Sequence, residues 1–365
     1  MPDLQRFIQT ENTPALRWAM LTNAAAVTNS GQWVLLELLR LGLRIEKILA
    51  PEHGLSAQAE DGQHQNHGHE PRTGLPVVSL YGDRLAPTAH DLADIDAVVV
   101  DLPNIGCRFY TYWWTITHVI EACAQLHKKV VILDRPSWRA SCSTEGPLLE
   151  TECQSFLGRW PMPITHPFTH GELALHFNAK RKLGVELRVI PPQPQQRFVP
   201  PSPSIGSQET IYLYPATGLL EGVNLSEGRG TAFPFRAIGA PWLRAAELHE
   251  VCTSWQVPGV EVAAFRFLPM WGTYAQTYCE GIFLSVTDVA QFHPVAFGLR
   301  LLNYIGTTYR NQLVPRAYRT VANPSGVNHL DRLTGMVNSF EKICCSGMLP
   351  ETEIQTLTRV PAGSW

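Results

Sequence analysis

Short apolar runs rich in β-branched residues alternate with helical patterns through residues 1–150. The runs are Leu16–Leu21, Ile45–Leu49, Val77–Leu80, Ala97–Leu102 and Val130–Leu133. Near-continuous apolar runs of this length are typical of strands that are buried on both faces of a parallel sheet. Between them, Trp33–Leu43 and Tyr112–Gln125 repeat apolar side chains at helical spacing. The alternation predicts an α/β fold in which helices connect the strands of an open parallel sheet.

The rest of the chain follows a less regular pattern. Its predicted elements are helices at 171–181, 245–257 and 294–304, strands at 260–267 and 281–286, and a proline-rich loop at 191–203. Thr169 is placed to cap the first of these helices. The sequence therefore predicts two domains, an α/β domain over residues 1–150 and a smaller α+β domain over residues 151–365.

Composition and charge exclude several classes of protein. A net charge of −3 gives no basic surface for nucleic acid or for an anionic membrane. The N-terminal residues lack the basic start and apolar run of a secretory signal, and no window approaches the roughly 20 apolar residues that span a bilayer. The eight cysteines are scattered without CxxC spacing. These features favour a cytoplasmic protein with free thiols, and they leave its oligomeric state open.

Polar side chains follow the predicted strands at the points where the strands end. They are Asn23, Glu52, Asn104, Asp134 and Arg135. Because ligands of open parallel sheets bind outside the carboxyl ends of the strands, these residues predict a ligand site at that edge.

Glu52 and His53 lie directly after a predicted buried strand and before Gly54. A carboxyl group in such a place can act as a general acid, because apolar surroundings raise its pKa and keep it protonated near neutral pH. From these residues alone, a glutamate that only braces the loop is an equally good interpretation.

The segment Asp101–Tyr112 is dense in side chains that recognise sugars. Tyr110 and Tyr112 can stack on the C–H groups of a pyranose, and Arg108 can bind a carboxylate through two N–H groups. Taken singly, the two tyrosines are more typical of core packing.

The loop 221–231 combines Glu221, Glu227 and Arg229 with glycines that let backbone N–H groups approach a ligand. It lacks the GK[ST] sequence of a P-loop. We interpret it as a binding loop, with an ordered structural loop as the alternative.

His64, His67 and His69 form a tight histidine cluster. Imidazoles suit zinc or nickel, but the surrounding segment is polar and contains glycine. We therefore interpret it as a solvated loop, and we expect no metal site.

In their order along the chain, these segments resemble the exo-β-N-acetylmuramidases, glycoside hydrolase family 171. The resemblance covers the chain from about Thr22 onward. It is carried by 50–54, 73–76, 79–82, 108–112, 133–136, 145–148, Thr169 with 171–174, 201–203, 220–222, 224–231, 234–235 and 239–242. A single motif of this kind is weak evidence, whereas so many in one order are specific.

The resemblance implies a Rossmann-like first domain, a smaller second domain and an active-site cleft between them. It implies release of non-reducing terminal N-acetylmuramic acid from peptidoglycan fragments without a cofactor, and it makes Glu52 the favoured catalytic acid. Glycoside hydrolysis usually needs a second carboxylate. The candidates are Asp101, Glu145, Glu221 and Glu227, among which we favour Asp101 and Glu227.

N-acetylmuramic acid carries a lactyl ether with a carboxylate, so a selective site should offer a cation. Arg108, Arg135 and Arg229 lie in suitable segments. The complete set of predicted substrate-binding residues is Asn23, His53, Arg108, Tyr110, Tyr112, Arg135, Glu145, Ser202, Glu221, Asn224, Arg229 and Thr231.

The chain departs from the family pattern at Asn104, Ser137 and Ser204, and in the stretch after Asn23. These departures leave two alternatives to the muramidase open, a binding protein that keeps the pocket without the chemistry and a hydrolase with altered sugar specificity. A third alternative is a metal-dependent enzyme that uses His53 with the histidine cluster.

Overall fold

A computed structural model describes residues 3–11, 15–194, 197–361 and 363, and these residues form two compact units. Unit 1 comprises Met1–Ile105, Tyr110–Trp138 and Phe168–Pro203. Unit 2 comprises Gly106–Phe109, Arg139–Pro167 and Ser204–Trp365.

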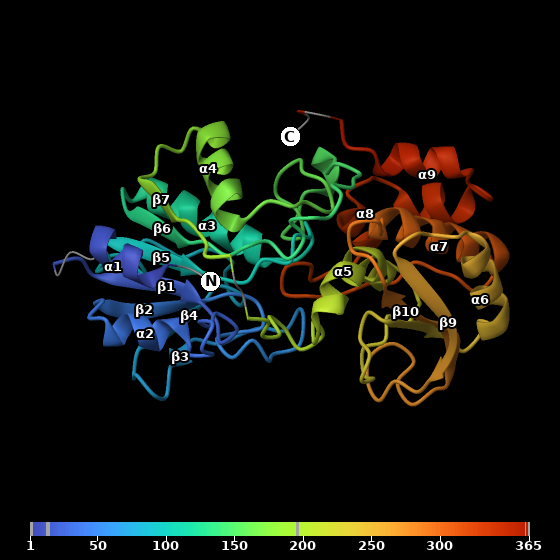
Figure 1. Cartoon of the computed structure of the whole chain (residues 1–365), viewed down its shortest axis with the longest axis horizontal. Coiled ribbons are helices and arrows are strands. Elements are labelled where there is room, and N and C mark those ends of the chain that lie inside the picture. The colour runs from blue at the N-terminus through green and yellow to red at the C-terminus, as the bar shows by residue number, and fades with distance from the viewer. Residues whose placement is uncertain (1–2, 12–14, 195–196, 362, 364–365) are drawn as a thin grey trace. The chain divides into compact units, whose positions relative to one another are not determined.

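Unit 1 is built on a seven-stranded sheet with the strand order β3-β4-β2-β1-β5-β6-β7 (Figure 1). The strands are β1 Trp18–Thr22, β2 Ile45–Ala50, β3 Gly68–His69, β4 Pro76–Ser79, β5 Ala97–Asp101, β6 Lys129–Leu133 and β7 Leu187–Ile190. All pairs are parallel except β3 with β4. The predicted open parallel α/β sheet is thus confirmed, with one antiparallel pair at the edge formed by β3.

The helices of unit 1 are α1 Leu4–Glu11, α2 Val34–Arg40, α3 Tyr112–Gln125 and α4 His170–Arg181. Phe7 of α1 and Leu38 of α2 join a core cluster with Trp18, Met20 and Val99 of the central strands. Burial of such side chains removes apolar surface from water and is the main force that holds these helices on the sheet. The predicted cap of α4 is confirmed, because Thr169 and Glu172 form a reciprocal capping box.

The partition differs from the expected single division after residue 150. Helix α4 and strand β7 follow that residue in the sequence, yet both belong to unit 1, where β7 pairs in parallel with β6. The short run Leu187–Ile190 contains Arg188 and is only partly buried, so it lacks the apolar signature of the central strands.

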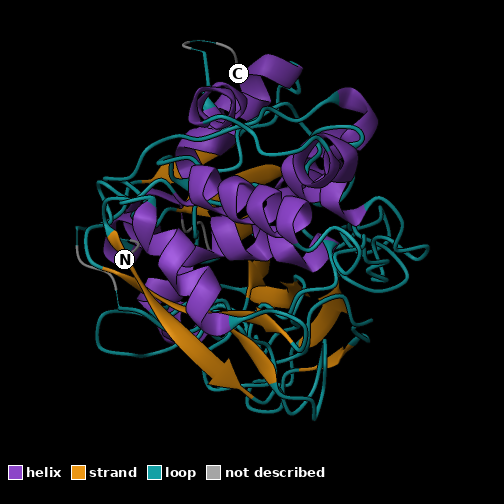
Figure 2. Ribbon diagram, turned by 90° about the vertical axis from the view of Figure 1, so that its right-hand side faces the viewer, coloured by secondary structure: helices purple, strands orange, loops and turns teal. Residues whose placement is uncertain are grey.

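Unit 2 contains a smaller antiparallel sheet with the strand order β8-β10-β9. Its strands are β8 Ala237–Ala240, β9 Val260–Phe267 and β10 Cys279–Val286. Its α-helices are α5 Gln208–Thr217, α6 Ala245–Ser254, α7 Pro294–Thr308, α8 His329–Thr334 and α9 Glu351–Thr358. Short helical turns, η1 Thr151–Cys153, η2 Gly218–Gly222 and η3 Glu341–Cys345, complete the unit. Helix α6 packs on β9 and β10, and α5 packs on α7. This combination of helices with a separate antiparallel sheet confirms the expected α+β class. Figure 2 shows the helices of the structure in purple and its strands in orange.

Gly222 allows the closest approach inside unit 2. A Cβ atom at this position would lie 2.6 Å from Cβ and 2.7 Å from Cα of Leu330. Only glycine lets η2 and α8 pack at this distance. The contact fixes the places of Glu221, which precedes Gly222, and of His329, which precedes Leu330. Across the described residues, no helix combines the length and apolarity needed to cross a membrane.

Candidate active site

Glu52 lies just beyond the carboxyl end of β2 and is only 6% exposed. Its Oε1 accepts a hydrogen bond from the backbone N–H of Gly62 at 2.9 Å, and its Oε2 accepts one from the hydroxyl of Thr111 at 2.6 Å. The two bonds come from segments far apart in sequence and hold the carboxyl group in one orientation. A buried carboxyl that is fixed in this way is suited to directional proton transfer.

His53, the next residue, has a left-handed backbone with φ of +66°, and Gly54 follows at +68°. Such a φ is uncommon for a residue with a side chain, and strain of this kind concentrates at functional sites. His53 Nδ1 lies 2.8 Å from the carbonyl oxygen of Ala59, and its ring stacks on Tyr110 at 6.4 Å between centroids. The turn therefore fixes both Glu52 and an aromatic wall beside it.

Tyr112 connects the ends of three segments of unit 1. Its hydroxyl accepts a hydrogen bond from Asn23 at 2.7 Å and donates one to the carbonyl oxygen of Pro201 at 2.5 Å. Tyr110 packs edge-on against Tyr112 at 4.8 Å, and burial raises the pKa of the Tyr110 hydroxyl, which bonds with Ser202. Unit 1 thus brings together several predicted site residues. We call this group the Glu52 cluster: Asn23, Glu52, His53, Tyr110, Thr111, Tyr112 and Ser202.

Asp101 and Arg135 form a buried ion pair beside this edge of the sheet. Arg135 Nε and Nη2 donate to the two carboxylate oxygens of Asp101 at 2.5 and 2.9 Å, and Arg135 also donates to the carbonyl oxygen of Val27. Asp101 is 0% exposed. The arrangement argues against the predicted roles, because the carboxylate and the guanidinium neutralise each other in a direct ion pair that is buried.

Arg108 is also a structural residue, contrary to its predicted role as a ligand of the lactyl carboxylate. It is fully buried in unit 2, where its terminal nitrogens donate to the carbonyl oxygens of Pro147, Met162 and Leu333. Burial lowers the pKa of its guanidinium to about 10. Although Tyr110 follows only two residues later, it belongs to unit 1.

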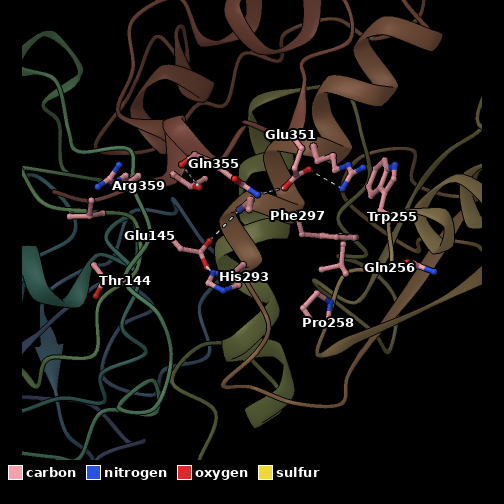
Figure 3. A pocket seen from close by; sticks show the side chains of 15 residues that line it. Thr144, Glu145, Trp255, Gln256, Pro258, His293, Phe297, Glu351, Gln355 and Arg359 are labelled. Carbon is pink, nitrogen blue, oxygen red and sulfur yellow. Dashed lines mark hydrogen bonds and ion pairs between the residues drawn. The ribbon is translucent and has the colours of Figure 1, made fainter. Parts of the chain in front are cut away.

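Glu145 stabilises the first turn of α7 instead of presenting a free carboxylate. Its Oε2 accepts hydrogen bonds from the backbone N–H groups of Val295 and Ala296, and its Oε1 lies 3.0 Å from Nδ1 of His293. Hydrogen bonding with Glu145 raises the pKa of His293, although partial burial opposes the shift. Both side chains line a cavity of about 820 Å³ in unit 2, where they point toward one another (Figure 3). An acidic group at a helix N-terminus is favourable without any ligand.

Asn224 and Thr231 brace the loop that contains them. The Asn224 side chain donates to the carbonyl oxygen of Gln312 at 2.9 Å and accepts from the N–H of Val314 at 2.8 Å. The Thr231 hydroxyl donates to the carbonyl oxygen of Gly228 at 2.7 Å. These bonds give both side chains a structural role that needs no substrate.

A second group of charged residues lies inside unit 2, and we call it the Glu227 cluster: Glu221, Glu227, Arg229, Arg316 and His329. Arg229 bridges the two carboxylates, with Nη2 2.6 Å from Glu221 Oε1 and Nε 3.1 Å from Glu227 Oε1. Arg316 Nη1 lies 4.0 Å from Glu227 Oε2, and His329 Nε2 lies 3.9 Å from Glu221 Oε2. Arg229 also donates to the hydroxyl of Ser204 at 2.6 Å, so this departure from the family pattern supports the cluster.

The environments of the two carboxylates drive their pKa values apart. Burial alone would raise the pKa of Glu221, but Arg229 and His329 outweigh it and lower that pKa to about 2. Burial, reinforced by the charge of Glu221, raises the pKa of Glu227 to about 7 against the opposing effect of Arg229. Two neighbouring carboxyl groups with separated pKa values are a frequent feature of acid–base sites.

The raised pKa of Glu227 predicts how stability depends on pH. In the unfolded chain this group loses its proton near pH 4.5, whereas in the folded chain it keeps the proton up to about pH 7. Stability from this group is therefore complete below pH 4.5 and is lost as pH rises through 7. We expect the melting temperature of the wild type, relative to that of Glu227→Gln, to fall by a few degrees between pH 5 and 8. Calorimetry at several pH values checks this, and parallel curves for the two proteins would contradict it.

Three residues with a part in these clusters were not predicted: Thr111, Arg316 and His329. Thr111 lies inside a predicted segment, but its bond to Glu52 depends on the tertiary fold.

The predicted histidine cluster has separate partners, since His64 pairs with Asp83 and His67 accepts from the N–H of Ser79. Within the described ranges, no group of three or more His, Cys, Asp or Glu residues is arranged to hold a metal ion.

Unit 1 has a buried acid at a strand end, and unit 2 has a cluster of carboxylates. These two features are typical of a two-domain hydrolase that uses acid–base chemistry. The N-terminal domain of the exo-beta-N-acetylmuramidase NamZ family matches residues 18–209, and its C-terminal domain matches residues 212–357. The chain belongs to this family. The peptidoglycan beta-N-acetylmuramidase NamZ of Bacillus subtilis (strain 168) is 38% identical to it over 277 residues, which are 73% of this chain and 67% of the relative.

Two solved structures share the fold. They are crystal structures of DUF1343 family proteins from Bacteroides fragilis NCTC 9343, with TM-scores of 0.83 and 0.70 and sequence identities of 24% and 25%. Each comparison covers 97% of this chain and 92% of the other. At this level of identity the similarity supports the architecture and does not assign residue roles.

Proposed function

We propose that this protein is an exo-β-N-acetylmuramidase that hydrolyses non-reducing terminal N-acetylmuramic acid from peptidoglycan fragments. The main structural support is the buried Glu52, which is held by Gly62 and Thr111 beside an aromatic wall at the carboxyl edge of the sheet. Family membership and the activity in the name of the Bacillus subtilis relative support the choice of sugar.

In this proposal Glu52 is the general acid. As the bond between the anomeric carbon and the glycosidic oxygen breaks, its electron pair passes to the oxygen, which takes the proton of Glu52. The oxygen of a water molecule bonds to the anomeric carbon and loses a proton to the second carboxylate. The hydroxyl of Thr111 and the N–H of Gly62 keep the carboxyl group oriented through this transfer. The faces of Tyr110 and His53 offer packing surface for a sugar ring.

For the second carboxylate we favour Glu227. Both oxygens of Asp101 are bonded to Arg135, Glu145 caps α7, and Glu221 is paired with Arg229. Glu227 Oε2, by contrast, has no hydrogen-bond partner among the described residues. A pKa near 7 suits a group that must accept a proton at neutral pH.

Release of a chromophore from a β-N-acetylmuramic acid glycoside, measured beside the matching N-acetylglucosamine glycoside, tests the proposed function. We expect turnover of the muramic acid substrate and a strong preference for it. A correctly folded protein that binds muramic acid fragments and turns over neither substrate would instead be a binding protein.

We also propose that the enzyme acts in the cytoplasm on fragments from cell-wall turnover. All eight cysteines lie in described ranges and none is paired in a disulfide, as suits a reducing compartment. Cell fractionation with a specific antibody checks this, and recovery from the medium or the wall fraction would contradict it.

A further inference from the structure

The Glu227 cluster contains buried polar atoms that the rest of the described chain does not satisfy. Glu227 Oε2, Arg316 Nη1 and both ring nitrogens of His329 are buried and have no hydrogen-bond partner among the described residues. Glu227 is 2% exposed and His329 is 3% exposed. More than about 90% of buried polar groups in proteins are hydrogen-bonded, so several unsatisfied atoms in one cluster indicate a place for a polar ligand group or ordered water.

The spacing of two of these atoms suits a ligand oxygen. Glu227 Oε2 and Arg316 Nη1 are 4.0 Å apart, which is too far for a direct hydrogen bond. An oxygen atom placed at hydrogen-bond distance from both would close the gap. Nη1 of Arg316 is buried, but the Arg316 side chain as a whole is 28% exposed, so the gap lies beside the surface of unit 2.

Arg316 differs from the three arginines that the sequence singled out. Arg108 donates to three backbone carbonyls, Arg135 is paired with Asp101, and Arg229 is bonded to Glu221 and Ser204. Each of these guanidinium groups is used within the protein. The sugar carboxylate therefore needs another cation.

The ring of Tyr318 holds the guanidinium group of Arg316 in place. The guanidinium carbon of Arg316 lies 4.7 Å from the ring centroid of Tyr318, and the same ring stacks on His329 at 4.6 Å. Stacking holds the guanidinium plane and leaves its edge for hydrogen bonds, which is the geometry that favours arginine over lysine for carboxylates.

We propose that Arg316 binds the lactyl carboxylate of the terminal N-acetylmuramic acid and thereby selects this sugar over N-acetylglucosamine. The identity of the ligand rests on the proposed function. A water molecule between Glu227 Oε2 and Arg316 can donate one hydrogen to Glu227 and the other to the ligand carboxylate, so Glu227 stays free to accept a proton in the proposed reaction. Arg229 bridges Glu221 and Glu227, whereas Arg316 Nη1 has no hydrogen-bond partner among the described residues and is the cation left for the ligand.

Equilibrium binding tests this proposal independently of catalysis. Free N-acetylmuramic acid and its lactyl methylamide, which lacks the charge, are titrated calorimetrically into the wild type, Arg316→Gln and the control Arg319→Gln. We expect Arg316→Gln to weaken binding of the acid by about tenfold or more, as for loss of a charged hydrogen bond, and to leave the amide unchanged. Arg319 is exposed in the same segment, so Arg319→Gln should bind both ligands as the wild type does.

Equal changes for both ligands, no change for either, or a wild type that binds the acid no better than the amide would overturn the proposal. If Arg316→Gln does not fold, Arg316→Lys decides the question. Lysine cannot form the two-pronged contact, so it should weaken acid binding at least about threefold without affecting the amide. If Arg316→Lys binds the acid as tightly as the wild type does, Arg316 does not bind the lactyl carboxylate. A wild type that binds the acid selectively yet cleaves no glycoside would refute only the proposed hydrolysis.

Discussion

Glu52→Gln is expected to lower kcat on the β-N-acetylmuramic acid glycoside by about 10²- to 10⁴-fold, the usual contribution of a general acid. The amide keeps the shape of the side chain and can still accept from the N–H of Gly62, but it has no acidic proton to give to the glycosidic oxygen. KM should change little, since the walls formed by His53 and Tyr110 remain. Steady-state kinetics with both proteins at the same pH gives the comparison.

Glu70→Gln provides the matched control. Glu70 is another buried carboxylate of unit 1, 4% exposed, and its Oε2 accepts hydrogen bonds from the N–H groups of Arg72 and Thr73. We expect this variant to keep kcat within about twofold, because local hydrogen bonds of this kind affect stability before chemistry. A similar drop for both variants, or a loss below tenfold for Glu52→Gln, would remove Glu52 as the acid.

Arg135→Met is expected to destabilise the protein by about 3–5 kcal/mol, because it leaves the carboxylate of Asp101 buried without its partner. The pair lies at the carboxyl edge of the sheet and also secures the carbonyl oxygen of Val27, so the loss should reach the loop after β1. Urea unfolding followed by fluorescence measures the change in the free energy of unfolding.

The double variant Asp101→Asn with Arg135→Met separates the buried charge from the other effects. Removing both charges should restore much of the lost stability, since a neutral pair has no unpaired ion to desolvate. Losses that simply add would show that the two residues are not coupled. Preserved binding of N-acetylmuramic acid in a folded double variant would further separate the pair from sugar recognition.

The fold was predictable where burial of a strand produced a clear apolar run in the sequence. The strands β1 and β5 are buried throughout, and β2, β4 and β6 are buried over half or more of their residues, so their apolar runs are readable without any tertiary information. Strand β7 escaped prediction because it is short and only partly buried, and helix α5 because it contains Pro215, which normally interrupts a helix. The chain also enters unit 2 at Gly106–Phe109 and returns, which no local pattern reveals.

The candidate site was predictable where parallel strands end together. That rule placed Glu52 and Asn23 at one edge, and it also placed Asp101 beside Arg135. It could not show that Asp101 and Arg135 would neutralise each other, because residue type does not reveal a partner. Arg316 and His329 follow no predicted strand. Their places depend on stacking with Tyr318 and on the close approach at Gly222, which are tertiary contacts.

The most direct test of the central claim is product analysis after incubation of the wild-type protein with peptidoglycan oligosaccharides that begin with N-acetylmuramic acid at the non-reducing end. The proposed function predicts free N-acetylmuramic acid as the first product, released one residue at a time from that end. Release of internal fragments, release of terminal N-acetylglucosamine instead, or intact oligosaccharides after incubation with folded protein would contradict it.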